Sequence, residues 1–163
     1  MAKKVAVSGV LIALAFIFSY IEVLIPFNFG IPGVKLGLAN IVSLVALYLL
    51  EEKTAATITI VRVILTGFTF GNLYSMLYSM TGALLSLGFM LGAKRWNKFT
   101  IVGVSALGGV MHNIGQLIMA AVVLQTVPFL YYTPILMLSG IGTGIVIGFL
   151  GKGICSRLKK MQA

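Results

Sequence analysis

Long apolar runs, separated by short polar or proline- and glycine-containing breaks, dominate this chain of 163 residues. Most runs approach the ~20 residues that a helix needs to cross the hydrocarbon core of a bilayer. The pattern predicts an all-α, polytopic membrane protein with six transmembrane helices in one domain, residues 1–163. The predicted spans are 5–25, 36–50, 54–70, 73–91, 99–125 and 132–150.

The break after the first span has a distinctive composition. Pro26 ends the apolar run, and the segment 26–33 holds a second proline and two glycines, so it cannot continue as a helix. We predict a shaped loop here. The second span is short for a membrane crossing, which leaves room for this loop to dip into the bilayer.

Basic residues are distributed very unequally between the two sides of the predicted bundle. With the N-terminus inside, the cytoplasmic side carries ten of the twelve lysines and arginines, while Lys35 lies outside and Arg62 lies within a span. The positive-inside rule therefore predicts that both termini are cytoplasmic and that the chain crosses the cell membrane several times. The net charge of +9 follows from this topology and from attraction to anionic lipid, not from a nucleic-acid surface.

The composition narrows the possible chemistry. Hydrophobic residues make up 60% of the chain and charged residues 9%, against ~25% in soluble proteins, which excludes an ordinary water-soluble domain. The three acidic residues are glutamates, and the sequence contains no aspartate and no GxxxxGK[ST] phosphate loop. One histidine, His112, and one distant cysteine, Cys155, cannot close a metal shell. We expect no enzymatic activity, no metal and no cofactor.

Small residues form stripes on three predicted helices. The fourth span carries Asn72, Ser75, Ser79, Gly82 and Ser86 on one face, and the sixth carries Gly140, Gly144 and Gly148. Such stripes let helices approach closely in lipid, either within one chain or in a homo-oligomer. The first span has two small faces, one with Gly9 and Ala13 and one with Ala15 and Ser19, which predicts two neighbours.

Polar groups inside the predicted spans are the candidate functional residues. Arg62 lies at the middle of the third span, where a charge costs several kcal/mol unless it is paired or solvated. Glu22 could pair with Arg62 or with Lys35, and either a structural ion pair or a ligand cavity would satisfy Arg62. His112, Asn113 and Gln116 cluster on the fifth span and serve either packing or a ligand.

Three stretches carry a family resemblance: Gly33–Asn40 (GVKLGLAN), Gly103–Gln116 (GVSALGGVMHNIGQ) and Glu22 before Ile25-Pro26. They resemble the Gx transporter family, also labelled heptaprenyl diphosphate synthase component I. That family is similar to the substrate-binding membrane subunits (S components) of energy-coupling-factor (ECF) transporters. The resemblance implies six helices, both termini inside, and an outward-facing pocket capped by the loop after the first helix. It also implies docking of the first helix on a coupling subunit through Gly9, Ala13, Ala15 and Ser19.

The expected function is a substrate-binding subunit of a small-molecule uptake transporter, energised by separate ATPase and coupling subunits. The loop 26–35 would roof the pocket. The expected substrate-binding residues are Glu22, Asn28, Lys35, Asn40, Arg62, Asn72, His112, Asn113 and Gln116. The alternative is a non-catalytic membrane accessory subunit for isoprenoid or quinone metabolism or for flavin-linked electron transfer. A chain without aspartate lacks the aspartate-rich motifs with which prenyl diphosphate synthases bind magnesium.

Overall fold

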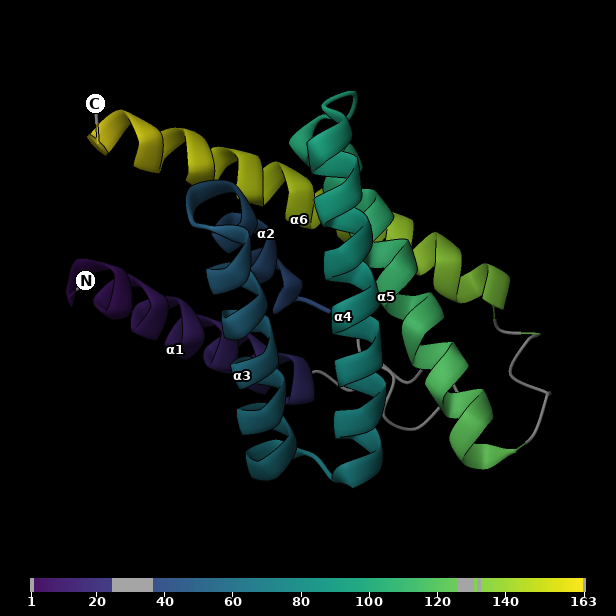
Figure 1. Cartoon of the computed structure of the whole chain (residues 1–163). Coiled ribbons are helices and arrows are strands. Elements are labelled where there is room, and N and C mark those ends of the chain that lie inside the picture. The colour runs from purple at the N-terminus through teal and green to yellow at the C-terminus, as the bar shows by residue number, and fades with distance from the viewer. Residues whose placement is uncertain (1, 25–36, 126–130, 132, 163) are drawn as a thin grey trace.

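The computed structural model describes residues 2–24, 37–125, 131 and 133–162. This part of the chain forms six helices and no strand (Figure 1). The helices are α1 (Ala2–Leu24), α2 (Asn40–Leu49), α3 (Glu52–Phe70), α4 (Leu73–Trp96), α5 (Ile101–Leu124) and α6 (Thr133–Gln162). The prediction of an all-α bundle with six helices is confirmed.

Five of these helices, α1 and α3 to α6, are long and apolar enough to cross a membrane. The second helix is shorter than predicted, because it begins at Asn40 and has only 10 residues. At 1.5 Å per residue it spans ~15 Å, about half of the hydrocarbon core. The chain is therefore a multi-pass membrane protein in which the described part of α2 is an internal helix.

Two helices extend past their predicted ends. α4 continues to Trp96 and α6 to Gln162, whereas the predicted spans end at residues 91 and 150. The apolar run marks only the part of a helix inside hydrocarbon, whereas lysine and arginine are good helix formers that also complement the helix C-terminal dipole. α4 ends at Asn97, which adopts a left-handed conformation with φ of 57°.

α2 forms the centre of the bundle. Eight consecutive residues, from Asn40 to Leu47, are buried, and the helix packs against α1, α3, α4 and α6. A helix that is apolar on all sides is stable only when neighbours surround it, because no face is then left for water. α1 is the most peripheral span: 11% of its residues are buried, against 33–39% in the other four.

Glycines bring α4, α5 and α6 into backbone contact. A Cβ added to Gly144 would lie 2.7 Å from Ala106 Cα of α5, and one on Gly148 would lie 2.7 Å from Val102 Cα. Gly140 likewise lies against the backbone of Gly109. The glycine stripe of α6 is thus buried against α5 of the same chain, which leaves it no exposed surface for a homo-oligomer.

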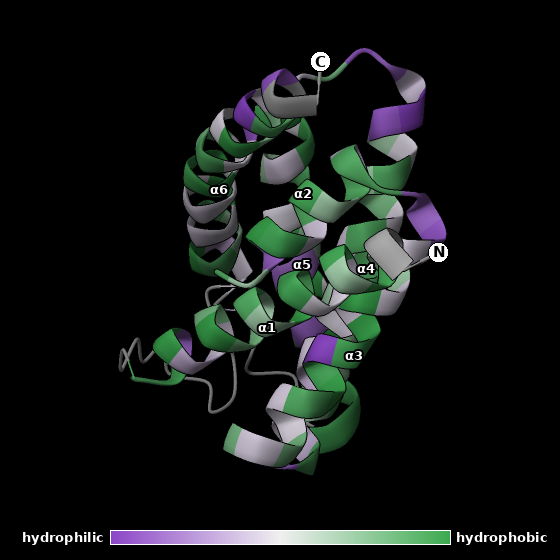
Figure 2. Cartoon of the chain, turned by 90° about the vertical axis from the view of Figure 1, so that its left-hand side faces the viewer, coloured by the Kyte–Doolittle hydropathy of each residue, from purple (hydrophilic) through white to green (hydrophobic). Residues whose placement is uncertain are grey.

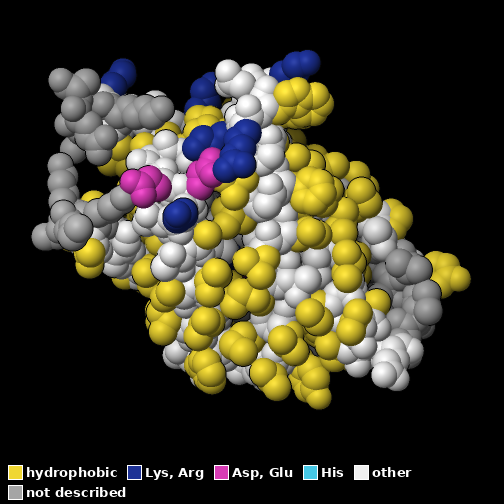
Figure 3. Space-filling view, viewed as in Figure 1, with side chains coloured by type: hydrophobic (Ala, Val, Ile, Leu, Met, Phe, Trp, Pro, Cys, Tyr) yellow, Lys and Arg dark blue, Asp and Glu magenta, His cyan; other side chains and the backbone are white. Residues whose placement is uncertain are grey.

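The outer surface separates into an apolar belt and a charged end. Figure 2 shows the hydrophobic colouring of the outward faces of α1 and α6, and Figure 3 shows lysine, arginine and acidic side chains gathered at one end of another face. There Arg95 of α4 forms an exposed ion pair with Glu52 of α3. Lys94 donates a hydrogen bond to the carbonyl of Leu47, at 2.6 Å. Charges at the helix ends leave the belt free to contact lipid.

Candidate functional site

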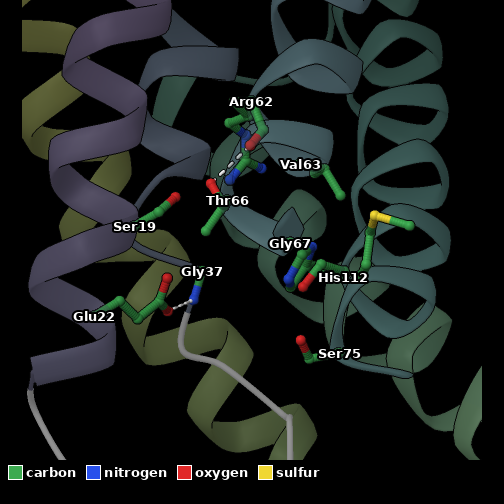
Figure 4. Close-up of a pocket in the computed structure, with 11 residues that line it drawn as sticks. Ser19, Glu22, Gly37, Arg62, Val63, Thr66, Gly67, Ser75 and His112 are labelled. Carbon is green, nitrogen blue, oxygen red and sulfur yellow. Dashed lines mark hydrogen bonds between the residues drawn. The ribbon is translucent and has the colours of Figure 1, made fainter. Parts of the chain in front are cut away.

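A small polar cavity lies between α1, α3, α4 and α5 (Figure 4). Its volume of about 20 Å³ is enough for about one water molecule. Charged, hydroxyl and imidazole side chains from four helices converge on it within the membrane-spanning bundle. The lining residues are Ser19, Glu22, Gly37, Arg62, Val63, Thr66, Gly67, Ser75, Met76, Ser79 and His112.

Arg62 is the charged group of this cavity with the most hydrogen-bond donors. Its side chain is 6% exposed, and Nη2 donates a hydrogen bond of 2.6 Å to Oδ1 of Asn40. Its Nε is buried and has no hydrogen-bond partner among the described residues. A guanidinium has five donors, so Arg62 retains capacity for a further acceptor at the cavity.

Glu22 joins the end of α1 to the segment that leads into α2. Its Oε1 accepts hydrogen bonds from the backbone N–H of Gly37 and, at 3.3 Å, from that of Leu38. Glu22 is 9% exposed, and its charge acts on Arg62. The cavity therefore contains groups of both signs, a carboxylate on α1 and a guanidinium on α3.

Gly37 has a conformation that favours glycine. Its φ is +83°, in the left-handed region, and an added Cβ would approach Nδ2 of Asn40 to 2.7 Å. The same Cβ would lie 3.4 Å from Cδ2 of His112. Glycine at position 37 therefore allows the backbone N–H to reach Glu22 while residue 37 packs between Asn40 of α2 and His112 of α5.

In the structure, Asn113 separates from the other two residues of the predicted cluster on α5. His112 lines the cavity, and its Nε2 lies 3.2 Å from Nε2 of Gln116. Gln116 is fully buried, and its Oε1 has no hydrogen-bond partner among the described residues. Asn113 instead donates a hydrogen bond of 2.6 Å to the carbonyl of Leu136 in α6. Neither Asn113 nor Gln116 lines the cavity: Asn113 is directed toward α6, and Gln116 lies between His112 and Gly82 of α4.

Two further predicted binding residues have other positions. Asn72 is exposed and caps α4: its Oδ1 accepts from the backbone N–H of Ser75 at 2.8 Å, in a reciprocal capping box. Asn40 does not line the cavity, but it contacts two residues that do: its Oδ1 accepts from Arg62, and its backbone N–H donates to the carbonyl of Gly37 at 2.8 Å. Asn28 and Lys35, together with the predicted roof 26–35, lie outside the described residues.

Several hydroxyl groups of this site were not predicted from the sequence. Thr66 lies one turn after Arg62, and its Oγ1 donates a hydrogen bond of 2.7 Å to the Arg62 carbonyl. Ser75 and Ser79 belong to the serine stripe of α4, which the sequence indicated only as a packing face. Helical spacing from Arg62 could have identified Thr66, four residues later. Ser75 and Ser79 lie on α4, which has no buried charge from which to count.

The predicted docking residues of α1 fall on two sides. Gly9 and Ala13 are exposed, and an added Cβ on Gly9 would meet nothing within 4 Å. Ala15 is fully buried in the core, and Ser19 is buried at the cavity. Ala15 and Ser19 therefore pack inside the chain, and only Gly9 and Ala13 remain available for an external partner.

The fold and the site define a class: a multi-pass helical membrane protein with a buried polar cavity that contains an arginine and a glutamate. The family described as heptaprenyl diphosphate synthase component I matches residues 11–154, and the chain belongs to this family. This confirms the resemblance found in the sequence. Neither a curated protein nor a solved structure matches the chain.

Proposed function

We propose that the chain is the substrate-binding membrane subunit of a small-molecule uptake transporter in the cell membrane. It is not itself an enzyme, and separate ATPase and coupling subunits supply the work. The observation that carries this proposal is Arg62, a buried guanidinium that borders an internal cavity and uses only part of its donor capacity on Asn40. Membrane proteins keep such groups chiefly where they meet a ligand or an ion pathway.

The groups at the cavity favour a small polar ligand. Arg62 offers donors to an anionic or carbonyl oxygen, whereas Glu22 accepts from a donor. Hydroxyl groups of Ser19, Thr66 and Ser79 can do either. The substrate class that fits is a small molecule with at least one carboxylate or carbonyl group and one N–H or O–H group.

Under this proposal, the small cavity represents a closed state of the binding site. A cavity of about 20 Å³ admits a water molecule but no larger ligand, so binding requires the wall to move. The wall at Gly37 and Leu38 is attached to α1 through hydrogen bonds to Glu22. We expect a ligand to compete with these backbone amides for Glu22 and thereby displace the segment. The shift toward the open state depends on how much more tightly the ligand binds the open state than the closed one.

The distribution of charge indicates the side from which the substrate enters. Glu22 lies near the C-terminal end of α1 and Ser75 in the first turn of α4, at the ends opposite Lys3 and Lys94. With the basic ends and both termini in the cytoplasm, the cavity lies toward the outer surface. This is the arrangement that uptake requires.

The proposal is tested by native mass spectrometry of the purified full-length protein, searching for a retained small molecule. We expect wild type and Arg95→Ala to retain the same ligand, because Arg95 is exposed and distant from the cavity. Arg62→Ala should lose it at least tenfold more readily while its unfolding temperature falls only a few degrees. Loss of folding in parallel with binding would instead make Arg62 a structural group and overturn the proposal.

A second candidate is a non-catalytic accessory subunit, the role that the family description suggests. Apolar hollows of about 420 and 390 Å³ open between α1, α2 and α6, and they suit a lipid-like ligand. Co-purification separates the two candidates. A coupling subunit and ATPases retained with the chain support transport, whereas a soluble prenyl synthase subunit retained in their place supports the accessory role.

A further inference from the structure

Two glycines orient the imidazole of His112 at the cavity wall (Figure 4). Its Cδ2 lies 3.4 Å from the position that a Cβ on Gly37 would take, and its Cε1 lies 3.1 Å from the corresponding position on Gly82 of α4. Nε2 is bonded to both of these ring carbons, so the Nε2 edge of the ring lies between the two glycines. There it is 3.2 Å from Nε2 of Gln116, one turn later on α5.

Gln116 is enclosed where α4 and α5 meet. Its side chain is 0% exposed, and a Cβ on Gly82 would lie 2.9 Å from its Cγ. A Cβ on Gly115 would come within 2.8 Å of the Gly82 Cα, so the two helix backbones are close together at this level. The amide of Gln116 is therefore held beside His112, although Gln116 does not itself line the cavity.

The hydrogen-bonding capacity of this pair determines where the imidazole carries its hydrogen. The amide nitrogen of Gln116 can only donate, so Nε2 of His112 accepts with its lone pair and the hydrogen of the neutral ring is on Nδ1. An imidazolium carries a hydrogen on both nitrogens and would place two donors against each other. The contact therefore fits one form of His112, the neutral ring with hydrogen on Nδ1.

The other end of the Gln116 amide supports this orientation. Its Oε1 is buried and has no hydrogen-bond partner among the described residues. A half rotation of the amide would put both N–H groups in that position, equally without a described acceptor. In protein backbones a buried N–H without a partner is rarer than an under-used carbonyl oxygen, and the same preference keeps the N–H groups of Gln116 toward His112.

We propose that Gln116 is a positioning residue of the cavity, which donates to Nε2 of His112 and holds the ring in its neutral Nδ1–H form. In water the neutral imidazole favours the opposite Nε2–H form, and the hydrogen bond at one ring nitrogen sets which nitrogen is protonated. The lone pair of Nε2 is then unavailable to a ligand, which meets its charged partners in Arg62 and Glu22. This consequence for a ligand rests on the proposed function, whereas the role of Gln116 toward His112 does not.

The inference is tested by nitrogen NMR of the imidazole. His112 is the only histidine of the chain, so its two ring nitrogens can be observed alone. The full chain is labelled with ring-15N histidine and purified in detergent without a histidine tag. Long-range proton–nitrogen correlation at neutral pH should show an unprotonated Nε2 and a protonated Nδ1 in the wild type. No ligand is added, so the result does not depend on whether the chain takes part in transport.

Three variants test Gln116 itself. Gln116→Met keeps a side chain of similar length but removes the donor, so the Nε2–H form should become the major one. Gln116→Glu puts a carboxylate acceptor beside the ring and should place a hydrogen on Nε2. Asn113→Leu is the matched control, because it removes a buried amide that bonds to Leu136 of α6, and it should leave the His112 signals unchanged. The unfolding temperature of each variant shows whether it is folded.

Three results would overturn the inference. The first is a wild-type spectrum with hydrogen on Nε2 or on both nitrogens. The second is an unchanged Nδ1–H form in Gln116→Met, or in Gln116→Glu where the methionine variant does not fold. The third is an equal change in folded Asn113→Leu, which would show that the tautomer responds to the packing of α5 in general.

Discussion

Asn40 and Arg62 connect the first turn of α2 to the middle of α3 through a hydrogen bond of 2.6 Å. Both side chains are buried, and the donor is charged. The short central helix is therefore held in register with a membrane-spanning helix by a polar contact inside the apolar bundle. The same contact leaves Nε of Arg62 at the cavity without a partner among the described residues.

This contact should be energetically coupled. In a double-mutant cycle of Asn40→Ala and Arg62→Ala, we expect a coupling of about 1.5–3 kcal/mol, the range for buried hydrogen bonds to charged groups. Thermal or denaturant unfolding in detergent provides the four free energies. The exposed pair of Glu52 and Arg95 is the control and should couple much more weakly. Additive effects at Asn40 and Arg62 would contradict the contact.

Glu22 should control the backbone at Gly37 and Leu38. Glu22→Ala removes the acceptor of both amide hydrogens, so these amides should exchange with deuterium faster. Glu22→Gln keeps a carbonyl oxygen at the same position and should preserve most of the protection. Hydrogen-exchange mass spectrometry of the peptide that begins α2 distinguishes the variants. Identical exchange in Glu22→Ala and wild type would rule out the attachment.

Gly37→Ala should destabilise the fold by about 1–3 kcal/mol, because the residue has a positive φ and an added Cβ would meet Asn40. Gly88→Ala is the matched control. An added Cβ at Gly88, within α4, meets nothing within 4 Å, and alanine favours helix there. Unfolding midpoints should therefore fall for the first variant and stay level or rise for the second. Equal midpoints would show that Gly37 is not constrained.

Gly144→Ala should weaken the packing of α6 on α5 by about 1–3 kcal/mol. The added methyl group would come within 2.7 Å of the Ala106 backbone, which cannot move aside as a side chain can. Gly142→Ala places the same methyl group on the outer face of α6, where nothing lies within 4 Å. The difference between the unfolding free energies of the two variants reports the cost of disturbing the α5–α6 contact. Equal stability of the two variants would contradict a close contact at Gly144.

The proposed orientation predicts a labelling pattern in a Cys155→Ser background. Tyr131, which precedes α6, is 87% exposed, and Tyr131→Cys should react with a membrane-impermeant maleimide on intact cells. Lys98→Cys, in the turn before α5, should react only after the membrane is permeabilised. The reverse pattern would place both termini outside.

The requirements for crossing a membrane explain why much of this architecture could be predicted from the sequence. Each crossing needs a long apolar helix with internally satisfied backbone groups, so hydropathy gave six helices and placed Arg62 as a costly buried charge. Hydropathy did not predict where α4 and α6 end or how short α2 is. Helix continues beyond hydrocarbon at basic residues, and α2 is set by the helices that enclose it.

Hydropathy and helical spacing were enough to predict the class of protein, the helix number, the small faces of α4 and α6, and the buried positions of Arg62, Glu22 and His112. Which polar groups come into contact depends on how the helices pack against one another. Helical spacing placed His112, Asn113 and Gln116 together, yet His112 lines the cavity while Asn113 bonds to α6. The physical reason is that the rotation of each helix about its axis depends on glycine contacts with its neighbours, such as Gly140 against Gly109, and these are non-local.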